Sequence, residues 1–395
     1  MKQQSIIGGI LLIVGMSVGS GMLALPATMA QHGFLGAVGL LVLGWVVVTF
    51  TAFLILEANL WCPPRSNLIS MAKSTLGLGG QAIAWIAYLM LLYALTSAMI
   101  AGGADVFTGI LHAIHIPIPL WLSAILFSAI LGFVVFKGIK VVDHINRGLM
   151  SVKFVAFAVV LLSIVPFVHL SQLGHFYSSS VSVALTVVVT AYGFSIVIPS
   201  LRDYYHSDVI QLRKVIFFGS LIPLLCYLIW VGVVLGTLPL QGSYGLITIL
   251  KSQNPNTALT LALQHYSNSA WITNCTRLFT SICLATTFLG VSLSLSDFLA
   301  DGFKMTKQGL EGLLIYSLTF IPPLLIVILY PAAFIKALSY AGICCTILLV
   351  LLPAAMVWSG RYRQNVKAPY RLMGGKPMLI FTILMGLIVA VSPFF

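Results

Sequence analysis

The stretch GMSVGSG at residues 15–21, followed by Pro26, decides the fold of this chain. It interrupts an apolar run near residues 6–30 that is long enough to cross a bilayer as a helix. A second apolar run, near residues 181–199, carries the similar stretch TAYGFSIVIPS at residues 190–200. A rise of about 1.5 Å per residue places both clusters of glycine and proline near half depth. The sequence therefore predicts two membrane spans whose helices break in the middle of the bilayer.

The composition indicates that the whole chain is embedded in a membrane. Of its 395 residues, 60% are hydrophobic and 7% are charged, whereas a soluble domain carries about 25% charged residues. Because unpaired backbone groups are costly in hydrocarbon, only helices and closed barrels cross a bilayer. The apolar runs are unbroken over roughly 18 to 27 residues and lack the alternation of barrel strands, which favours an all-α fold.

We predict about eleven helical spans, which fall into two series. The first series lies near residues 6–30, 34–60, 81–111, 119–136 and 148–168. The second series lies near residues 181–199, 215–238, 272–296, 312–330 and 333–359, and an additional span lies near residues 377–394.

Basic residues predict the orientation of these spans. If the N-terminus is cytoplasmic, only Lys251 and Lys336 of the 20 basic residues fall on the outer side, and Arg277 lies within a span. Such an excess of basic residues on one side identifies the cytoplasmic face. An odd number of spans then leaves Phe395 outside. Since the membrane accounts for the net charge of +12, no nucleic-acid partner is expected.

The connections between spans are short, except for the outer stretch 238–271. Its mixture of apolar residues with Asn254 and Pro255 predicts two short helical pieces, which form either a lid or an inert connector. Charged residues at or near span ends are expected to lie close to water. The acidic ones are Glu57, Asp105, Asp297 and Asp301.

The positions of the interrupted spans predict a binding site. They are the first and the sixth, so each opens one half of the chain, and the two halves, residues 1–168 and 181–359, run antiparallel, as in an inverted repeat. Free N–H groups after the first break suit a carboxylate, and free carbonyl groups at the second suit an ammonium. Together they suit a zwitterion such as an amino acid. The alternative is that the glycines only allow close helix packing.

Six stretches of sequence carry a family resemblance. They are VGSGMLALP at 18–26, LMLLYALTSA at 89–98, NRGLMSVK at 146–153, IPSL at 198–201, LATTFLGVSLSLSDFLAD at 284–301 and YRLMGGKP at 370–377. In these the chain resembles the bacterial aromatic amino acid permeases of the hydroxy and aromatic amino acid permease family, and among them the tyrosine-specific members.

The resemblance implies both a fold and an activity. The implied fold is the leucine-transporter fold of the amino acid, polyamine and organocation superfamily, a 5+5 inverted repeat with an eleventh transmembrane helix. The implied activity is proton-coupled uptake of tyrosine, or of tryptophan or phenylalanine, by alternating access across the bacterial cytoplasmic membrane. A sodium-coupled or broader neutral amino acid symporter is the second hypothesis.

The candidate substrate-binding residues lie at the two breaks and on the third and eighth spans, where aromatic rings can stack on an aromatic substrate. They are Gly19, Ser20, Gly21, Tyr93, Thr96, Tyr192, Gly193, Phe194, Ser195 and Phe288. Related permeases tend to carry histidine where this chain has Ser195, which changes one wall of the expected pocket.

Lys153 is the candidate for proton coupling. It lies about five residues into the fifth span, where a charge costs about 2.5 to 3.5 kcal/mol. The resemblance implies that its ammonium takes the place of a sodium ion, so that its protonation links uptake to the proton gradient. Thr286 and Thr287 are expected to add hydroxyl groups beside it. The alternatives are a lysine that reaches the headgroups and threonines that only pack helices.

The remaining motifs exclude other functions. The six cysteines have no metal-ligand or disulfide spacing, and no metal or other cofactor is expected. The chain shows neither a zinc-binding HExxH nor a paired carboxylate on facing spans, so it is not expected to be an enzyme. It also lacks a selectivity-filter loop, which makes a channel the weaker alternative. The expected partners are an amino acid, a proton and membrane lipid.

Overall fold

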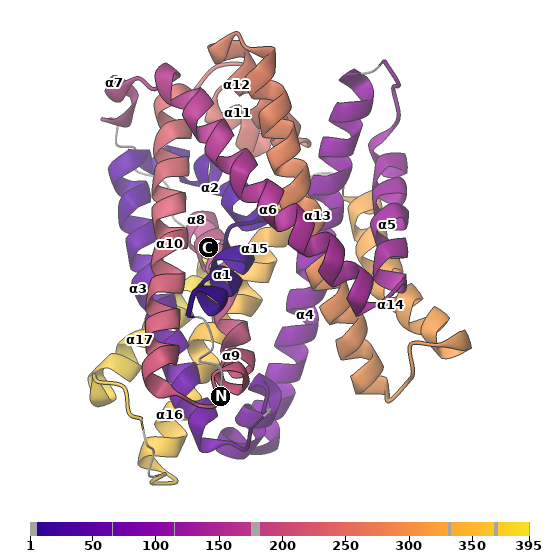
Figure 1. Ribbon diagram of the computed structural model, residues 1–395. Coiled ribbons are helices and arrows are strands. Elements are labelled where there is room, and N and C mark those ends of the chain that lie inside the picture. Colours follow the sequence, from indigo (N-terminus) through magenta and orange to yellow (C-terminus); the bar gives the residue numbers. More distant parts are fainter. Residues whose placement is uncertain are drawn as a thin grey trace.

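The computed structural model describes residues 6–64, 66–113, 115–174, 182–330, 333–366 and 370–394, and across these ranges it contains helices and no strand (Figure 1). Residue 181 and Phe395, for which a span start and an outer position are predicted, lie outside these ranges. Within them, 8 helical stretches are long and apolar enough to cross a membrane. Three shorter apolar helices are Ile6–Ser17, Leu120–Phe136 and Gly375–Val391.

The elements follow one another along the chain without sheet structure in the described ranges. They are α1 (Ile6–Ser17), α2 (Ser20–Met29), η1 (Ala30–His32), α3 (Gly33–Trp61), α4 (Leu68–Ala113), α5 (Leu120–Phe136), α6 (Ile139–Ile164), η2 (Val165–Phe167), α7 (Leu170–Leu173), α8 (Ser182–Ala191), η3 (Gly193–Val197), α9 (Ile198–Tyr204), α10 (Val209–Thr237), α11 (Leu246–Lys251), α12 (Pro255–Ser267), α13 (Ala270–Phe303), α14 (Gly309–Leu329), α15 (Ala333–Thr346), η4 (Ile347–Leu351), α16 (Leu352–Tyr362), α17 (Gly375–Val391) and η5 (Ser392–Phe394).

The first span consists of two helices. Helix α1 ends at Ser17 and α2 begins at Ser20, and between them Gly19 has an extended backbone, with φ −157° and ψ −148°. Gly21 allows a close approach to α8, because a Cβ there would lie 3.0 Å from the Cα of Ala191. The close approach of backbones therefore joins the two interrupted spans in space.

The sixth span is broken into three pieces. Helix α8 ends at Ala191, a short 3₁₀ helix η3 follows, and α9 begins at Ile198. Pro199 lies in the first turn of α9, where a residue without an N–H group costs no helical hydrogen bond. The glycine and proline positions of this stretch thus coincide with the change of helix type.

Helices α4 and α6 begin well before the spans predicted for them. Helix α4 begins at Leu68, and a kink at Gly77, with φ 75°, separates its first turns from the third span. Helix α6 begins at Ile139 rather than near residue 148, so Lys153 lies about 21 Å along the helix from its start. The added turns of α6 contain charged residues, since the helix continues out of the apolar region.

The spans pack into one bundle around the two interrupted helices. Helix α1 packs along α10, α2 along α8, and α15 along both α4 and α8, while α13 contacts α4 and α6. Helices α11 and α12, which correspond to the two short pieces predicted for the outer stretch, cover the end of the bundle drawn at the top of Figure 1.

Two acidic residues expected near water are instead buried, and for these the expectation was wrong. Glu57 in α3 is 0% exposed and pairs with Arg361 at the end of α16; the Arg361 Nε lies 2.7 Å from the Glu57 Oε1. The Arg361 guanidinium also donates to the Leu372 carbonyl. Asp105 in α4 is 2% exposed and accepts the backbone N–H of Asn256, at the start of α12, at 2.8 Å. Glu57 therefore connects α3 to α16, and Asp105 connects α4 to α12.

Candidate functional site

Tyr227, in the middle of α10, connects the two helix breaks. Its hydroxyl oxygen lies 2.6 Å from the Ser17 carbonyl oxygen and 2.8 Å from the Ala191 carbonyl oxygen. Ser17 and Ala191 are the last residues of α1 and α8, and carbonyl groups at a helix end have no partner within the helix. Tyr227 is fully buried, so a single side chain brings the free ends of both broken helices to one point.

Lys153 approaches the first break from α6. Its ammonium nitrogen lies 3.3 Å from the Gly15 carbonyl oxygen, and the residue is 1% exposed. In a continuous helix that carbonyl would accept the N–H of residue 19, but α1 ends before it. The buried side chain thus points into the bundle rather than to lipid headgroups.

Helix α13 completes a group of residues around the first break. The Thr287 hydroxyl, which donates to the Cys283 carbonyl at 2.8 Å, lies 3.0 Å from the place a Cβ of Gly19 would occupy. Cys283 is itself buried and lies one turn before Thr287 on α13. We refer to Gly15, Gly19, Lys153, Cys283 and Thr287 as the Lys153 cluster.

The neighbouring Thr286 has a different environment. Its hydroxyl donates to the carbonyl groups of Ile282 and Cys283 in its own helix, at 2.8 and 3.1 Å. Of the two predicted threonines, Thr287 is therefore the one that the structure brings to Gly19.

The sixth-span break carries two buried hydroxyl groups. Tyr192 and Ser195 are both 0% exposed, and neither hydroxyl has a hydrogen-bond partner within the part of the chain that the structure describes. Leaving a buried polar group unpaired costs about 1 to 3 kcal/mol. The Tyr192 ring also packs on Tyr227, with 5.1 Å between ring centroids. We call the hydrogen bonds from the Tyr227 hydroxyl to Ser17 and Ala191 the Tyr227 bridge. The sixth-span break therefore presents two unused hydroxyl groups beside this bridge.

The other predicted residues of the two breaks lie within the same region. Ser20 and Gly21 are buried in the first turn of α2, and Phe194 is buried in η3. Gly193 opens η3, and a Cβ there would lie 3.8 Å from the sulfur of Cys345 in α15.

Three predicted residues on the third and eighth spans make other contacts. The Tyr93 hydroxyl donates to the Leu318 carbonyl of α14 at 2.9 Å. The Phe288 ring packs on Phe127 of α5 and Phe320 of α14, with centroid distances of 5.3 and 5.9 Å. The buried Thr96 hydroxyl donates within α4. Tyr93 thus contacts α14, and Phe288 contacts both α5 and α14.

Sequence reasoning missed an aromatic cluster beside the Tyr227 bridge. Trp230 of α10 packs on Phe157 of α6 and Phe279 of α13, with centroid distances of 6.4 and 6.0 Å, and all three are buried. Tyr227 and Trp230 are three residues apart, so they share one face of α10. That spacing of two large polar aromatic residues within an apolar span was the available signal.

Sequence comparisons relate the chain to known membrane transport proteins over nearly its whole length. Residues 2–393 match the family described as the tryptophan/tyrosine permease family. The chain is 33% identical to tyrosine-specific transport system 2 of Haemophilus influenzae, over 100% of this chain and 97% of that protein. It is 30% identical to a tryptophan-specific transport protein of the same organism, over 98% of this chain and 95% of that protein.

A solved structure supports the fold. The structure of MhsT in complex with L-phenylalanine superposes with a TM-score of 0.64, covers 98% of each chain and is 11% identical in sequence. At this identity the likeness concerns the fold alone, and it confirms the predicted leucine-transporter fold.

Proposed function

We propose that this chain, which belongs to the tryptophan/tyrosine permease family, takes up an aromatic amino acid, preferentially tyrosine, together with a proton. Family membership makes it a multi-pass membrane transporter and not an enzyme, as expected from the sequence. Proton coupling and the preference for tyrosine are the parts that we infer.

The two breaks supply complementary groups for the amino acid. Helix α2 begins at Ser20, where free N–H groups and the positive end of the helix dipole suit the substrate carboxylate. The carbonyl groups of Ser17 and Ala191 end α1 and α8 and suit its ammonium. Each carbonyl oxygen has a second lone pair beyond the one used by Tyr227.

The preference for tyrosine rests on the sixth-span break. The unpartnered hydroxyl groups of Tyr192 and Ser195 offer partners to a phenolic hydroxyl, and a site built to pair a substrate hydroxyl rejects the analogue that lacks it. Phe194 adds an aromatic surface in the same 3₁₀ turn. The name of the tyrosine-specific relative agrees with this inference, while the tryptophan-specific relative provides the competing substrate.

One observation carries the proposal of proton coupling: the Lys153 ammonium lies 3.3 Å from the Gly15 carbonyl oxygen. When protonated, the side chain supplies a positive charge at the end of α1, where a cation stabilises the helix dipole. When it loses its proton, this charge is lost and the end of α1 is released. In this way a proton takes the place of a bound metal cation.

The proposed membrane placement follows the charges. We infer a cytoplasmic N-terminus from the positively charged loops, and the family resemblance implies the bacterial inner membrane. Residues 1–168 and 181–359 form the two inverted repeats, and residues 377–394, which overlap α17 (Gly375–Val391), form the additional span.

Uptake of labelled tyrosine into liposomes with the purified protein tests the coupling. An imposed pH gradient, with sodium held constant, should drive accumulation by the unmodified protein. Lys153→Gln should abolish gradient-driven accumulation but retain tyrosine counterflow, while Lys137→Gln, a cation at the exposed end of α5, should behave as the unmodified protein. Undiminished accumulation by Lys153→Gln, or uptake that requires sodium, would contradict the proposal.

A further inference from the structure

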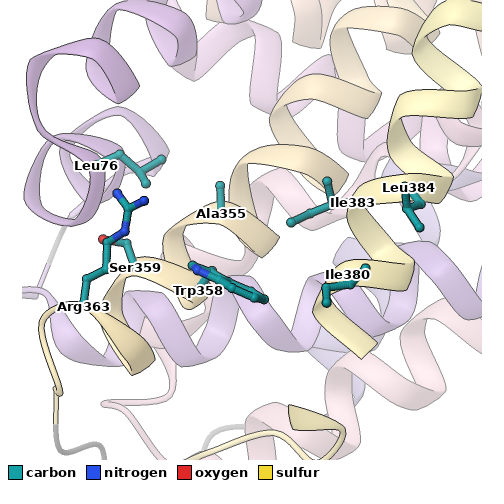
Figure 2. A pocket seen from close by; sticks show the side chains of 8 residues that line it. All are labelled: Leu76, Ala355, Trp358, Ser359, Arg363, Ile380, Ile383 and Leu384. Atoms are coloured by element: carbon teal, nitrogen blue, oxygen red, sulfur yellow. The ribbon is translucent and has the colours of Figure 1, made fainter. Parts of the chain in front are cut away.

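A groove lies between α4, α16 and α17, and none of its lining residues belongs to either helix break. It encloses about 370 Å³. Figure 2 shows that α16 and α17 supply its two sides and that Leu76 of α4 closes one end. The apolar lining residues are Leu76, Ala355, Trp358, Ile380, Ile383 and Leu384.

The position of these residues places the groove at the membrane surface. Ile380 and Leu384 lie about 8 and 14 Å along α17 from its start at Gly375. They are 46% and 54% exposed, so they face outward. Trp358 lies one turn before the end of α16 and packs on Tyr362, an arrangement typical of the membrane interface. The groove therefore runs from the interface into the depth occupied by acyl chains.

The mouth of the groove is positively charged. Arg363, at its end beside Leu76, is exposed (Figure 2). Three ion pairs are seen in the described ranges, and Arg363 is in none of them. Its neighbour Arg361 is already paired with Glu57. Lys376 at the start of α17 lies 5.1 Å from the Tyr362 ring centroid and adds a second cation.

We propose that this groove binds one anionic phospholipid, such as phosphatidylglycerol. Its phosphate would pair with Arg363, and an acyl chain would lie on Trp358 between α16 and α17. A guanidinium suits a phosphate because its N–H groups match the phosphate oxygens. The groove also matches the amphipathic form of a lipid, since one end is cationic and the rest of its lining is nearly all apolar.

The polar groups of the groove do not suit the transported amino acid. Apart from Arg363, the polar side chain in the lining is Ser359, whose hydroxyl donates to the Thr75 carbonyl at 2.6 Å. An amino acid would need acceptors for its ammonium as well as a donor for its carboxylate. The lipid site is therefore separate from transport, and its test does not depend on the proposed function.

Quenching of Trp358 fluorescence tests the proposal. The protein is reconstituted in phosphatidylcholine, and phosphatidylglycerol or phosphatidylcholine with brominated acyl chains is titrated. The Trp358 signal is the difference between the unmodified protein and Trp358→Phe. We expect this signal to be quenched at about fivefold lower phosphatidylglycerol than phosphatidylcholine, which corresponds to about 1 kcal/mol for a basic residue at an anionic surface.

Charge variants separate a specific site from general attraction. Arg363→Gln should remove the fivefold preference, Arg363→Lys should keep most of it, and Lys137→Gln should keep it fully. Because Arg363 is exposed, its replacement should leave the fold intact, and a thermal melt of each variant checks this. Equal quenching by both lipids in the unmodified protein, or an unchanged preference in Arg363→Gln, would overturn the proposal.

Discussion

The ammonium nitrogen of Lys153 lies 3.3 Å from the carbonyl oxygen of Gly15, in the last turn of α1. A buried charge within a membrane span is costly, so it persists where it has a partner and a role. Here the partner is backbone that the helix break has released. The break and the charge thus explain each other: α1 must end for its carbonyl to be free, and Lys153 compensates for the lost helical hydrogen bond.

Tyr227→Phe should weaken the connection between the two breaks. The ring remains, while the hydroxyl that bonds to Ser17 and Ala191 is removed. Because two buried carbonyl groups lose a donor, we expect a loss of about 1 to 3 kcal/mol in stability. Both accumulation and counterflow of tyrosine should fall, in contrast to Lys153→Gln. Thermal unfolding in detergent and liposome uptake measure these effects, and the exposed Tyr340→Phe serves as the control.

Gly21→Ala should separate α2 from α8. The added methyl group would lie 3.0 Å from the Ala191 Cα and 3.3 Å from its Cβ. Overpacking of this kind costs about 1 to 3 kcal/mol, and transport should fall with it. Gly39→Ala in α3 is the matched control, since a Cβ there meets nothing within 4 Å. Equal melting temperatures and uptake rates for the two variants would show that the close approach is unimportant.

Glu57→Gln should destabilise the protein strongly. It leaves the buried Arg361 without its carboxylate, and breaking a buried ion pair costs about 3 to 5 kcal/mol. The double variant Glu57→Leu, Arg361→Met should recover much of that loss, because no charge is left unpaired. Asp143→Asn, which breaks the exposed pair with Arg147, should change stability by less than about 1 kcal/mol. Chemical unfolding of the four proteins checks the order.

Asp105→Ala should loosen the outer helix α12. The Asp105 Oδ2 accepts the N–H groups of Asn256 and Thr257 at 2.8 and 3.2 Å, in the manner of a helix cap. Loss of a cap costs about 1 kcal/mol, so amide exchange at the start of α12 should accelerate about fivefold. Asp105→Asn retains a carbonyl acceptor and should show a smaller change.

A second cap provides the control for this measurement. The Asp208 Oδ1 accepts the N–H groups of Ile210 and Gln211 at the start of α10. Asp208→Ala should therefore speed exchange there and leave α12 unaffected. Unchanged exchange in α12 of Asp105→Ala would show that other contacts hold this helix in place.

The features that could be predicted from the sequence are those that residues close together along the chain determine. Apolar runs predicted the spans. Clusters of glycine and proline predicted both breaks, because the backbone chemistry of these residues determines where a helix can end. Lys153 stood out since a charge in an apolar run is rare. Each of these signals depends on a short stretch of chain.

The remaining features depend on which face of a helix meets which neighbour. Tyr93 and Phe288 lie on spans predicted to reach the substrate, and the sequence did not indicate that Tyr93 contacts α14 or that Phe288 contacts α5 and α14. Tyr227 bridges two breaks that are 210 and 36 residues away along the chain. Glu57 looked like an interfacial charge because its partner, Arg361, is 304 residues distant. Such pairings arise only when the bundle assembles.

The Tyr227 bridge also has a consequence for how an empty carrier differs from a loaded one. A hydroxyl has one hydrogen, and Tyr227 divides it between two acceptors from opposite halves of the protein. An ammonium brings three hydrogens to the same place. If the substrate binds there as proposed, its ammonium supplies a separate hydrogen to each of the two carbonyl groups. Substrate binding itself would then change how strongly the two halves of the protein are held together.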